Sequence, residues 1–357
     1  MKTKVLAAMS GGVDSSVAAA VLKSEGYDVT GVTMEIWSGE ACGIEGRHHG
    51  CYGPGEKEDV EDAQKVAQKI GIPLYIFDLR EVYKAEVLDY VQQEYLSGRT
   101  PNPCIRCNRI IKLGALIEKA RDAGIESDFF ATGHYARIEC DESRRICLLK
   151  KAKDQTKDQS YFLSLVSKQQ LGRLLLPLGN FSKDKVRELA SELGLDVHDK
   201  PESQNFISGG YYSLFKAAVQ PGPILDGKGN ILGQHKGIPY YTIGQRRGLG
   251  ISSDEAVYVT AIYPERNAIQ VGKREELFSD ELIASELNWI AVDGLDKPTR
   301  VKAKIRYFSK EAAAVLTPLD KDKVHVRFEE PQMAITPGQA VVFYDDDVVI
   351  GGGIIEE

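Results

Sequence analysis

The sequence predicts an α/β protein with an N-terminal parallel-sheet domain, a small Gly/Pro-rich central domain and a C-terminal antiparallel β-barrel. From Lys2 to about Asp199, apolar runs alternate with amphipathic stretches, which is typical of a parallel sheet with crossover helices. Between about Gln204 and Gly272, glycine and proline become frequent and long helical patterns disappear. From about Glu281 onward, short alternating strands separated by turn residues favour a small barrel. The expected domains are residues 1–203, 204–279 and 280–357.

Each expected strand of the first domain is a short apolar run, and each expected helix has apolar residues at spacings of three and four. Ligands bind beyond the carboxyl ends of the strands in such sheets, so the turns that follow the strands should converge on one crevice. The expected strands are Val5–Met9, Val29–Met34, Leu74–Leu79 and Phe129–Thr132, with helices near residues 13–25, 57–70, 84–96, 113–123 and 183–193, and barrel strands at Arg300–Tyr307, Ala313–Thr317, Lys323–Phe328, Ala340–Tyr344 and Val348–Ile354.

Composition is that of an ordinary soluble protein: of 357 residues, 43% are hydrophobic and 27% are charged. No apolar run approaches the roughly 20 residues that span a bilayer, and the N-terminus leads into the first strand without a signal-peptide pattern. We therefore expect a cytoplasmic enzyme with no membrane partner. The net charge of −7 argues against a strongly basic nucleic-acid-binding protein, so any RNA contact must come from local clusters of Lys and Arg.

A turn rich in serine and glycine, which reads Ser-Gly-Gly-Val-Asp-Ser-Ser over residues 10–16, joins the first strand to the first helix. Its adjacent glycines let the backbone approach a ligand, so amide N–H groups at the helix start can point at phosphate oxygens. No lysine follows the glycines as it would in a Walker-type loop. An ordinary strand-to-helix turn is the alternative. The order of residues resembles the PP-loop of the N-type ATP pyrophosphatases, which cleave ATP to AMP and pyrophosphate and adenylate an acceptor oxygen.

A second informative segment, residues 98–108, reads Gly-Arg-Thr-Pro-Asn-Pro-Cys-Ile-Arg-Cys-Asn, and its two prolines predict a loop. It carries the thiols of Cys104 and Cys107 among nearby cations. Because a neighbouring positive charge lowers the pKa of a thiol, we expect reactive thiolates here. A structural zinc site is the alternative, and it would need a second pair of ligands. The cations are Arg99, Arg106, Arg109 and Lys112, and the candidates for a second ligand pair are Cys42, His48, His49 and Cys51.

The remaining cysteines are expected to be reduced, because disulfides are rare in a reducing compartment. Cys140 and Cys147 flank a short polar stretch with a hairpin-like pattern. We expect both to pack as small hydrophobic side chains.

Together with further motifs in the same order, these segments resemble the tRNA-specific 2-thiouridylases, the MnmA family, over essentially the whole chain. The further motifs are Ala131–Tyr135, Lys157–Phe162, His235–Gly237, Tyr241–Gly250, Pro337–Gln339 and Gly351–Gly353.

The resemblance implies an N-terminal PP-loop domain of the adenine nucleotide alpha hydrolase type and ATP-dependent 2-thiolation of the wobble uridine of tRNA. The uracil C2 oxygen attacks the α-phosphate and becomes adenylated, and sulfur then displaces AMP. Mg²⁺ is expected on the phosphates. Asp14 is expected to assist the nucleotide and metal rather than to act as a base. The implied ATP-binding residues are Ala8, Met9, Ser10, Gly11, Gly12, Val13, Asp14, Ser15, Met34 and Gly133.

The resemblance also implies contacts with the anticodon stem-loop, from which the target uridine must be splayed out. Cys107 takes the position of the family's nucleophile. Without the resemblance, Arg306 and Tyr307 would read as part of an ordinary barrel strand with a solvated arginine. The implied tRNA-binding residues are Asn102, Pro103 and Cys104, which touch the target base, and His134, Lys157, Asp158, Gln159, Arg306, Tyr307 and Gln339.

Two departures from the family pattern fall on the sulfur chemistry: Cys104 stands where the family has Asp, and Ile207 stands where it has a second cysteine. In one hypothesis, Cys104 and Cys107 form a local relay that holds and releases sulfur. In the other, they are ligands of a [4Fe–4S] cluster, with Cys51, or else Cys42, as the third ligand. These two cysteines lie in an insertion, residues 42–52, whose alternative interpretation is a flexible loop with incidental thiols.

A PP-loop ligase or amidase that adenylates a small-molecule carboxylate or amide is the alternative function. It would use the same ATP loop but would not need paired thiols. The sulfur donor, either a sulfur-carrier protein or sulfide, is left open by the sequence.

Overall fold

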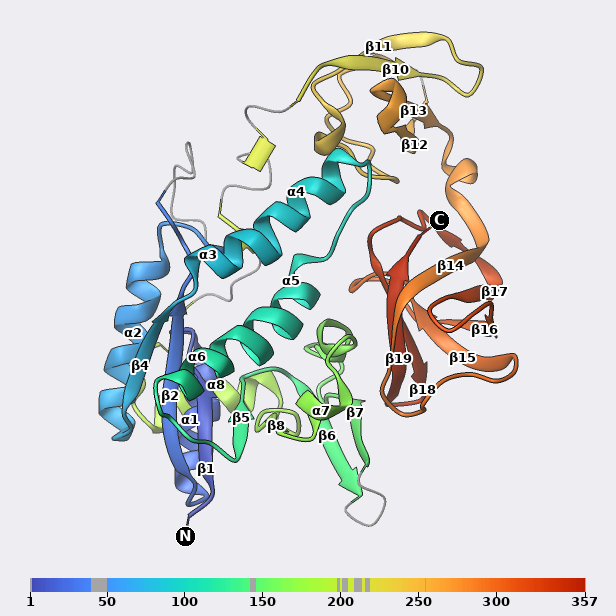
Figure 1. Ribbon diagram of the computed structural model, residues 1–357. Helices are drawn as coiled ribbons and strands as arrows, with labels where there is room; N and C mark the ends of the chain where they lie inside the picture. The colour runs from blue at the N-terminus through green and yellow to red at the C-terminus, as the bar shows by residue number, and fades with distance from the viewer. Residues whose placement is uncertain are drawn as a thin grey trace.

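The computed structural model describes residues 2–39, 50–141, 146–197, 200, 205–208, 214–215, 219–253 and 255–356. Figure 1 shows the parallel-sheet domain on the left, the barrel on the right and a small β-sheet domain at the top. None of the helices in the described ranges is long and apolar enough to cross a membrane.

The N-terminal sheet is parallel throughout and confirms the predicted class. Alternate residues of β1 point to opposite faces: Val5 and Ala7 pack with α1, α2 and α8, whereas Leu6 packs against the helices that follow β4. The strand order is β4 (Leu74–Asp78), β2 (Asp28–Glu35), β1 (Lys4–Ala8), β5 (Phe129–Ala131) and β8 (Leu174–Leu175). The helices of the first face are α1 (Val13–Ser24), α2 (Glu56–Ile70) and α8 (Lys183–Glu192).

On the second face, two long helices each contain a π-helical segment. Asn102 caps the second of them, with its side chain accepting from the Ile105 amide at 3.3 Å and Pro103 in the first turn. Cys104 and Cys107 therefore lie on a helix, and the prediction of a loop through Asn108 was wrong, because Asn-Pro is here a helix start. The segments are α3 (Arg80–Tyr83), η1 (Lys84–Leu88) and α4 (Asp89–Leu96), then α5 (Pro103–Arg106), η2 (Cys107–Ala115) and α6 (Leu116–Asp122).

The C-terminal barrel has six strands and is closed by pairing of β14 with β19. The long strand β14 was not among the predicted strands. The outer face of β18 shares one apolar core with the first domain, so the two domains are packed together. The strands in order are β14 (Phe278–Trp289), β17 (Val324–Met333), β16 (Ala312–Pro318), β15 (Thr299–Lys304), β18 (Ala340–Asp345) and β19 (Val348–Ile355).

The central domain is a four-stranded sheet in the order β11 (Ile231–His235), β10 (Gly222–Leu225), β13 (Ala268–Gly272), β12 (Tyr258–Tyr263). A separate parallel pair joins β3 (Gly50–Tyr52) to β9 (Asn205–Ile207). It brings the described end of the insertion, residues 50–52, beside the segment of Ile207.

A hairpin of β6 (Ala136–Asp141) and β7 (Ile146–Lys151) leaves the first domain and pairs with β19. Cys140 and Cys147 face each other across it, and they form a disulfide. The expectation of reduced, packed thiols was wrong for this pair. The prediction failed because it rested on composition and cellular compartment. Neither shows that the register of this hairpin places Cys140 opposite Cys147.

Candidate active site

The Ser-Gly-Gly loop is preformed around the start of α1. Gly12 is the N-cap residue and has no side chain to cap the helix, so the first amide N–H groups are not satisfied by a cap. The Ser15 and Ser16 hydroxyls both donate to the Gly12 carbonyl, at 3.1 and 2.8 Å, and the Ser10 amide donates to Ser15 Oγ at 3.1 Å. The loop thus offers the uncapped amides of the helix start to an anion.

Two glycines are required by close approaches to this loop. Gly11 has a φ of +69°, and a Cβ there would lie 2.1 Å from the Asp59 carbonyl oxygen of α2. A Cβ on Gly133, after β5, would lie 2.7 Å from the amide nitrogen of Ser15. The predicted residues after β1 and β5 therefore meet, while Met34 stands half-buried at the end of β2 and Met9 is buried beneath the loop.

Asp14 is held by two side chains that sequence reasoning missed. Tyr135 donates its hydroxyl to Asp14 Oδ1 at 2.7 Å, and Lys183 Nζ lies 2.8 and 2.9 Å from the two carboxylate oxygens. Lys183 is 8% exposed and begins α8, for which Ser182 is the cap. The only sequence signal for the Lys183 contact was the Ser182-Lys183 pair at the start of α8. A carboxylate engaged in this way orients cations near the loop and is poorly placed to accept a proton.

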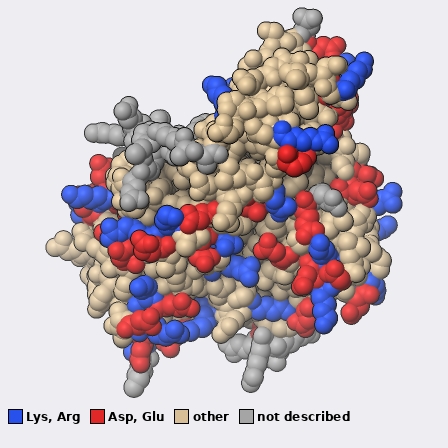
Figure 2. Space-filling view, turned by 45° about the horizontal axis from the view of Figure 1, so that its top comes forward, with Lys and Arg blue, Asp and Glu red and all other residues tan. Residues whose placement is uncertain are grey.

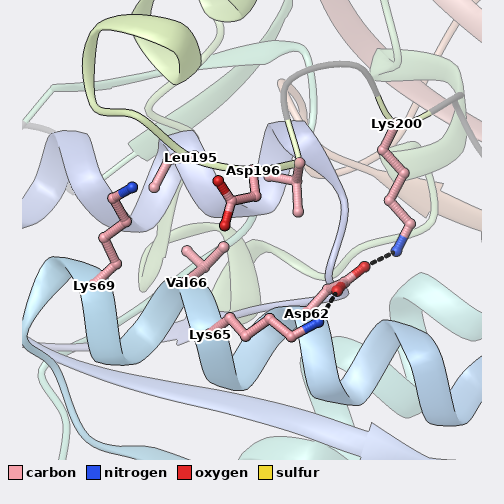
Figure 3. Close-up of a pocket in the computed structure, with 8 residues that line it drawn as sticks. Asp62, Lys65, Val66, Lys69, Leu195, Asp196 and Lys200 are labelled. Carbon is pink, nitrogen blue, oxygen red and sulfur yellow. Dashed lines mark hydrogen bonds and ion pairs between the residues drawn. The ribbon is translucent and has the colours of Figure 1, made fainter.

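Lys200 connects the Ser-Gly-Gly loop to α2. Its ammonium lies 2.6 Å from Asp59, 2.8 Å from Asp62 and 3.2 Å from the Gly11 carbonyl oxygen. Figure 3 shows Asp62 between Lys200 and Lys65. These three side chains are among those that line a cavity of about 250 Å³. This cavity contains none of the predicted ATP or tRNA residues, so it is separate from the predicted site.

The two helix thiols are not the thiolates that the sequence predicted. Burial raises the pKa of Cys104 to about 12, and it raises the pKa of Cys107 to about 11, although Lys112 lowers both. Two of the expected cations are engaged elsewhere: Arg99 pairs with Glu94 and Arg106 with Glu86. The prediction of lowered pKa values was wrong because the sequence showed the charges but not the burial.

Arg109 is exposed, and of the four expected cations only Lys112 lowers the pKa of the two thiols. Burial lowers the pKa of Lys112, but the thiols of Cys107, Cys51 and Cys104 raise it more, so that the net shift is upward. All three cysteines therefore lie near one ammonium group. Lys112 also lowers the pKa of His134, which follows Gly133.

Cys51 is exposed on β3, directly beside the β9 strand of Ile207, whose side chain is 1% exposed. Within the described ranges, no group of three or more His, Cys, Asp or Glu side chains is arranged to hold a metal ion. Cys42, His48 and His49 lie outside the described residues. As they stand, the three thiols do not form a cluster site.

The segment before Cys104 is where the three domains meet. Gln339 Nε2 donates to the Thr100 carbonyl oxygen at 3.0 Å, and the Thr100 amide donates to the Pro337 carbonyl at 2.8 Å. The Thr100 hydroxyl also donates to that of Thr242 in the central domain, at 3.3 Å. Gln339 thus positions the start of the helix that carries Cys104 in α5 and Cys107 in η2, which we call the thiol helix.

Several of the predicted tRNA residues are engaged within the protein. Asp158 is 8% exposed and accepts from the Ala152 amide and the Ser160 hydroxyl, and Gln159 accepts from the Tyr135 amide. His134 shares a 2.9 Å hydrogen bond between its Nδ1 and Thr132, and burial, with Lys112, lowers its pKa to about 3.

Arg306 follows the end of β15 and lies in a turn, not in the predicted strand. Its guanidinium donates to the Met333 and Ala334 carbonyl oxygens, both at 2.7 Å. Tyr307 packs on Phe162, which follows the Lys157–Gln159 segment, with ring centroids 4.4 Å apart. The structure thus brings these two predicted tRNA segments together.

Charge is mixed on the face shown in Figure 2. Acidic and basic side chains are interspersed across its lower part, and the upper part is largely uncharged. Lys150, Lys151 and Lys302 are each paired with an acidic residue. Arg246 and Arg247 are exposed, and among the described residues they have no ion-pair partner.

Comparison with known proteins agrees with this architecture. Residues 3–208 match the family model described as a tRNA methyl transferase HUP domain, residues 215–273 a tRNA methyl transferase PRC-barrel domain, and residues 279–355 an aminomethyltransferase β-barrel domain. The tRNA-specific 2-thiouridylase MnmA of Acetivibrio thermocellus is 49% identical, and the alignment covers 99% of both chains. That of Clostridioides difficile is 50% identical over 100% of this chain and 99% of its own.

Among solved structures, a 4-thiouridine synthetase–RNA complex with bound ATP matches 57% of this chain and 44% of its own, with 20% identity and a TM-score of 0.37. The fold and its preformed loop define a HUP-domain protein that carries a PRC-barrel and a C-terminal β-barrel. Within that class, the chain belongs to the family of tRNA-specific 2-thiouridylases.

Proposed function

We propose that this protein is a tRNA-uridine 2-sulfurtransferase that uses ATP and Mg²⁺ to thiolate the wobble uridine. One observation supports the proposal: the residues that follow β5 link the Ser-Gly-Gly loop to Lys112 of the helix that carries Cys104 and Cys107. Gly133 lies against Ser15 of the loop, and the next residue, His134, is close enough to Lys112 for that charge to lower its pKa. Lys112 in turn lies near the thiols.

In the first step, ATP binds to residues 8–15, with Met34 against the adenine and Gly133 near the nucleotide. The uracil C2 oxygen attacks the α-phosphate and pyrophosphate leaves. Mg²⁺ supplies charge neutralisation at the phosphates, and Asp14 and Lys183 orient the charges around them. Amides at the α1 start stabilise the phosphate oxygens.

In the second step, sulfur attacks C2 and AMP leaves. Cys104 and Cys107 are three residues apart on one helix, so their side chains share a face, and this supports a local relay. One thiol carries a persulfide; its terminal sulfur attacks C2, and the other thiol then attacks the bridging sulfur. The products are 2-thiouridine and a Cys104–Cys107 disulfide, which an external thiol reduces.

A [4Fe–4S] cluster on Cys104, Cys107 and Cys51 is the second hypothesis for the sulfur step. The nearness of all three thiols to Lys112 supports it, but the cluster requires a rearrangement of these side chains. Iron and sulfide analysis of anaerobically purified protein separates the two hypotheses. The relay predicts active protein without iron and an active Cys51→Ser variant, whereas the cluster predicts several irons per chain that Cys51→Ser loses.

The proposed partners are the anticodon stem-loop of tRNA and a sulfur donor, and the proposed location is the cytoplasm. For the relay, the donor is a carrier protein whose persulfide passes its outer sulfur to the relay thiol and leaves as a thiol. For the cluster, the donor is sulfide. Pyrophosphate release from ATP tests the function. Release that requires tRNA lacking the 2-thio group, with 2-thiouridine found by mass spectrometry at the wobble position, is the expected result. Release that requires a small carboxylate or amide and ignores tRNA would instead indicate a PP-loop ligase.

A further inference from the structure

Phe308 is 92% exposed, although it is a large aromatic residue at the junction of the barrel and the first domain. Single exposed apolar residues are common on proteins, so exposure alone assigns no role. Phe308 differs from such residues in its surroundings. Its backbone and the neighbouring rings are held by contacts within the protein, whereas its own ring is exposed to solvent.

The turn that carries Phe308 is held at both ends. The Ser309 amide donates to the Arg306 carbonyl at 3.1 Å, and the Arg306 amide donates to the Ser309 hydroxyl at 3.3 Å. The Arg306 guanidinium is anchored on two carbonyl oxygens of the chain after β17, as described above. A turn closed in this way presents the side chain at its tip with little conformational freedom.

The ring of Phe308 is the outer end of a row of aromatic rings. Tyr161 is fully buried, and its ring lies 5.6 Å from that of Phe162. Phe162 packs on Tyr307 at 4.4 Å, and Tyr307 meets Phe308 edge to face at 4.8 Å. Tyr307 is thus packed between Phe162 and Phe308, and Phe308 is the exposed ring at the end of the row.

This row begins at the thiol helix. Asn108, which follows Cys107, donates its side-chain amide to the Phe162 carbonyl oxygen at 3.1 Å. The Lys304 ammonium lies 5.4 Å from the Tyr307 ring centre and is half-buried. The aromatic row thus connects the helix of Cys107, through the protein interior, to the exposed ring of Phe308, and Lys304 places a cation beside the Tyr307 ring of that row.

We propose that Phe308 is a stacking platform for an unpaired base of the anticodon loop that flanks the target uridine. The inference rests on the proposed function, since it takes tRNA as the substrate. Extrusion of the uridine breaks its stacking with the neighbouring bases. An exposed aromatic ring replaces that stacking without regard to base identity, because every base has a π-face. Phe308 thereby stabilises the opened loop, while sequence is selected elsewhere.

The test compares Phe308→Ala, Phe308→Leu and Phe308→Trp in the full-length protein, with an unmodified anticodon stem-loop RNA as the probe. From the usual contribution of base–aromatic stacking, we expect Phe308→Ala to weaken the Kd by about five- to 100-fold. Phe308→Trp should bind like the wild type, and Phe308→Leu should resemble Phe308→Ala because it is apolar but has no π-face. Leu319→Ala is the matched control, since Leu319 is a 53% exposed apolar residue between other strands of the same barrel.

A second readout uses 2-aminopurine next to the target uridine, whose fluorescence is quenched by stacking. The wild type should quench it more than Phe308→Ala does. The slope of log Kd against log salt should be equal for both, because stacking releases no counterions.

Two results would overturn the inference: equal Kd and equal quenching for wild type and Phe308→Ala, or a loss of binding that accompanies a change from dimer to monomer in solution. The second would assign Phe308 to an interface between copies of the chain. Failure of the proposed function is distinguishable from both, because the wild type would then release no pyrophosphate in response to tRNA.

Discussion

The hydroxyl of Tyr135 donates a 2.7 Å hydrogen bond to the carboxylate of Asp14, and this bond joins the chain after β5 to the start of α1. Lys183 completes the arrangement from α8. Three segments that are far apart in the sequence thus converge on one carboxylate of the ATP-type loop. The orientation of Asp14 depends on all of them.

Lys183→Met should raise the KM for ATP by about 10- to 100-fold, in line with the loss of a hydrogen bond to a charged group. The reason is that the variant removes the buried cation nearest the loop and leaves the Asp14 charge without its ion pair. Pyrophosphate release at varied ATP measures the effect. Lys185→Met, which affects an exposed ion pair on the same helix, should leave the KM unchanged, and equal effects of the two variants would refute the assignment.

Lys200→Ala should weaken ATP binding and lower the thermal midpoint, because Lys200 ties Gly11 to α2. The control is Lys65→Ala, which removes a more exposed partner of the same Asp62 and should change little. Hydrogen bonds to Asp59 and Asp62 outweigh burial and raise the pKa of Lys200. A raised lysine pKa means that this stabilisation is present below the ordinary lysine pKa, near 10.4, and is lost as the pH rises through the folded value. A wild-type and a Lys200→Ala protein with equal midpoints at pH 7 would contradict the prediction.

Alkylation by iodoacetamide at pH 7.5 should modify Cys51 well before Cys104 and Cys107. Cys51 is exposed, whereas the helix thiols have pKa values of about 12 and about 11, and the thiolate is the reactive form. Peptide mass spectrometry against time measures the order. Lys112→Met should slow the alkylation of Cys107 further, because Lys112 lowers the pKa of that thiol. Equal rates at all three cysteines would show that the helix thiols are not buried in solution.

The free energy of unfolding should decrease above pH 9, and the raised pKa values of Cys104 and Cys107 are the reason. Their folded pKa values lie above the ordinary cysteine value of about 8.5, so the folded state favours the protonated form. The stabilisation is present below about pH 8.5 and is lost as the pH rises toward the folded values. Thermal midpoints of wild type and a Cys104→Ala/Cys107→Ala variant, measured from pH 7 to 10, should show a steeper decline for the wild type.

His134 should be neutral throughout the physiological range, because its pKa is about 3. Any contact that His134 makes with tRNA is therefore made by a neutral ring and not by a cation. A lowered folded pKa for a base means that its stabilisation is present above the ordinary value of about 6.5 and is lost as the pH falls toward 3. His134→Gln should reduce the fall in thermal midpoint between pH 7 and pH 4. An NMR titration that gave His134 a pKa near 6.5 would refute this account.

Much of the fold was readable from local patterns. Most strand and helix positions of the first domain followed from apolar periodicity, and the Ser-Gly-Gly turn followed from its place between β1 and α1. Strand β8 was missed, and the helix predicted near residues 113–123 begins at Pro103. Errors arose where one residue type serves two purposes. Asn102 and Pro103 start a helix, although the same pair also punctuates loops. Cys140 and Cys147 pair because of a hairpin register that no spacing rule reveals.

The fold class, the Ser-Gly-Gly loop and two thiols three residues apart could be predicted without a structure, because they depend on residue order alone. The chemical state of those groups depends on the folded chain. Burial and long-range contacts, which residue order does not contain, raise the pKa of Cys104 and Cys107 against their neighbouring cations. The same contacts bring Lys183 to Asp14 from 169 residues away and leave Phe308 exposed at the end of its row of rings.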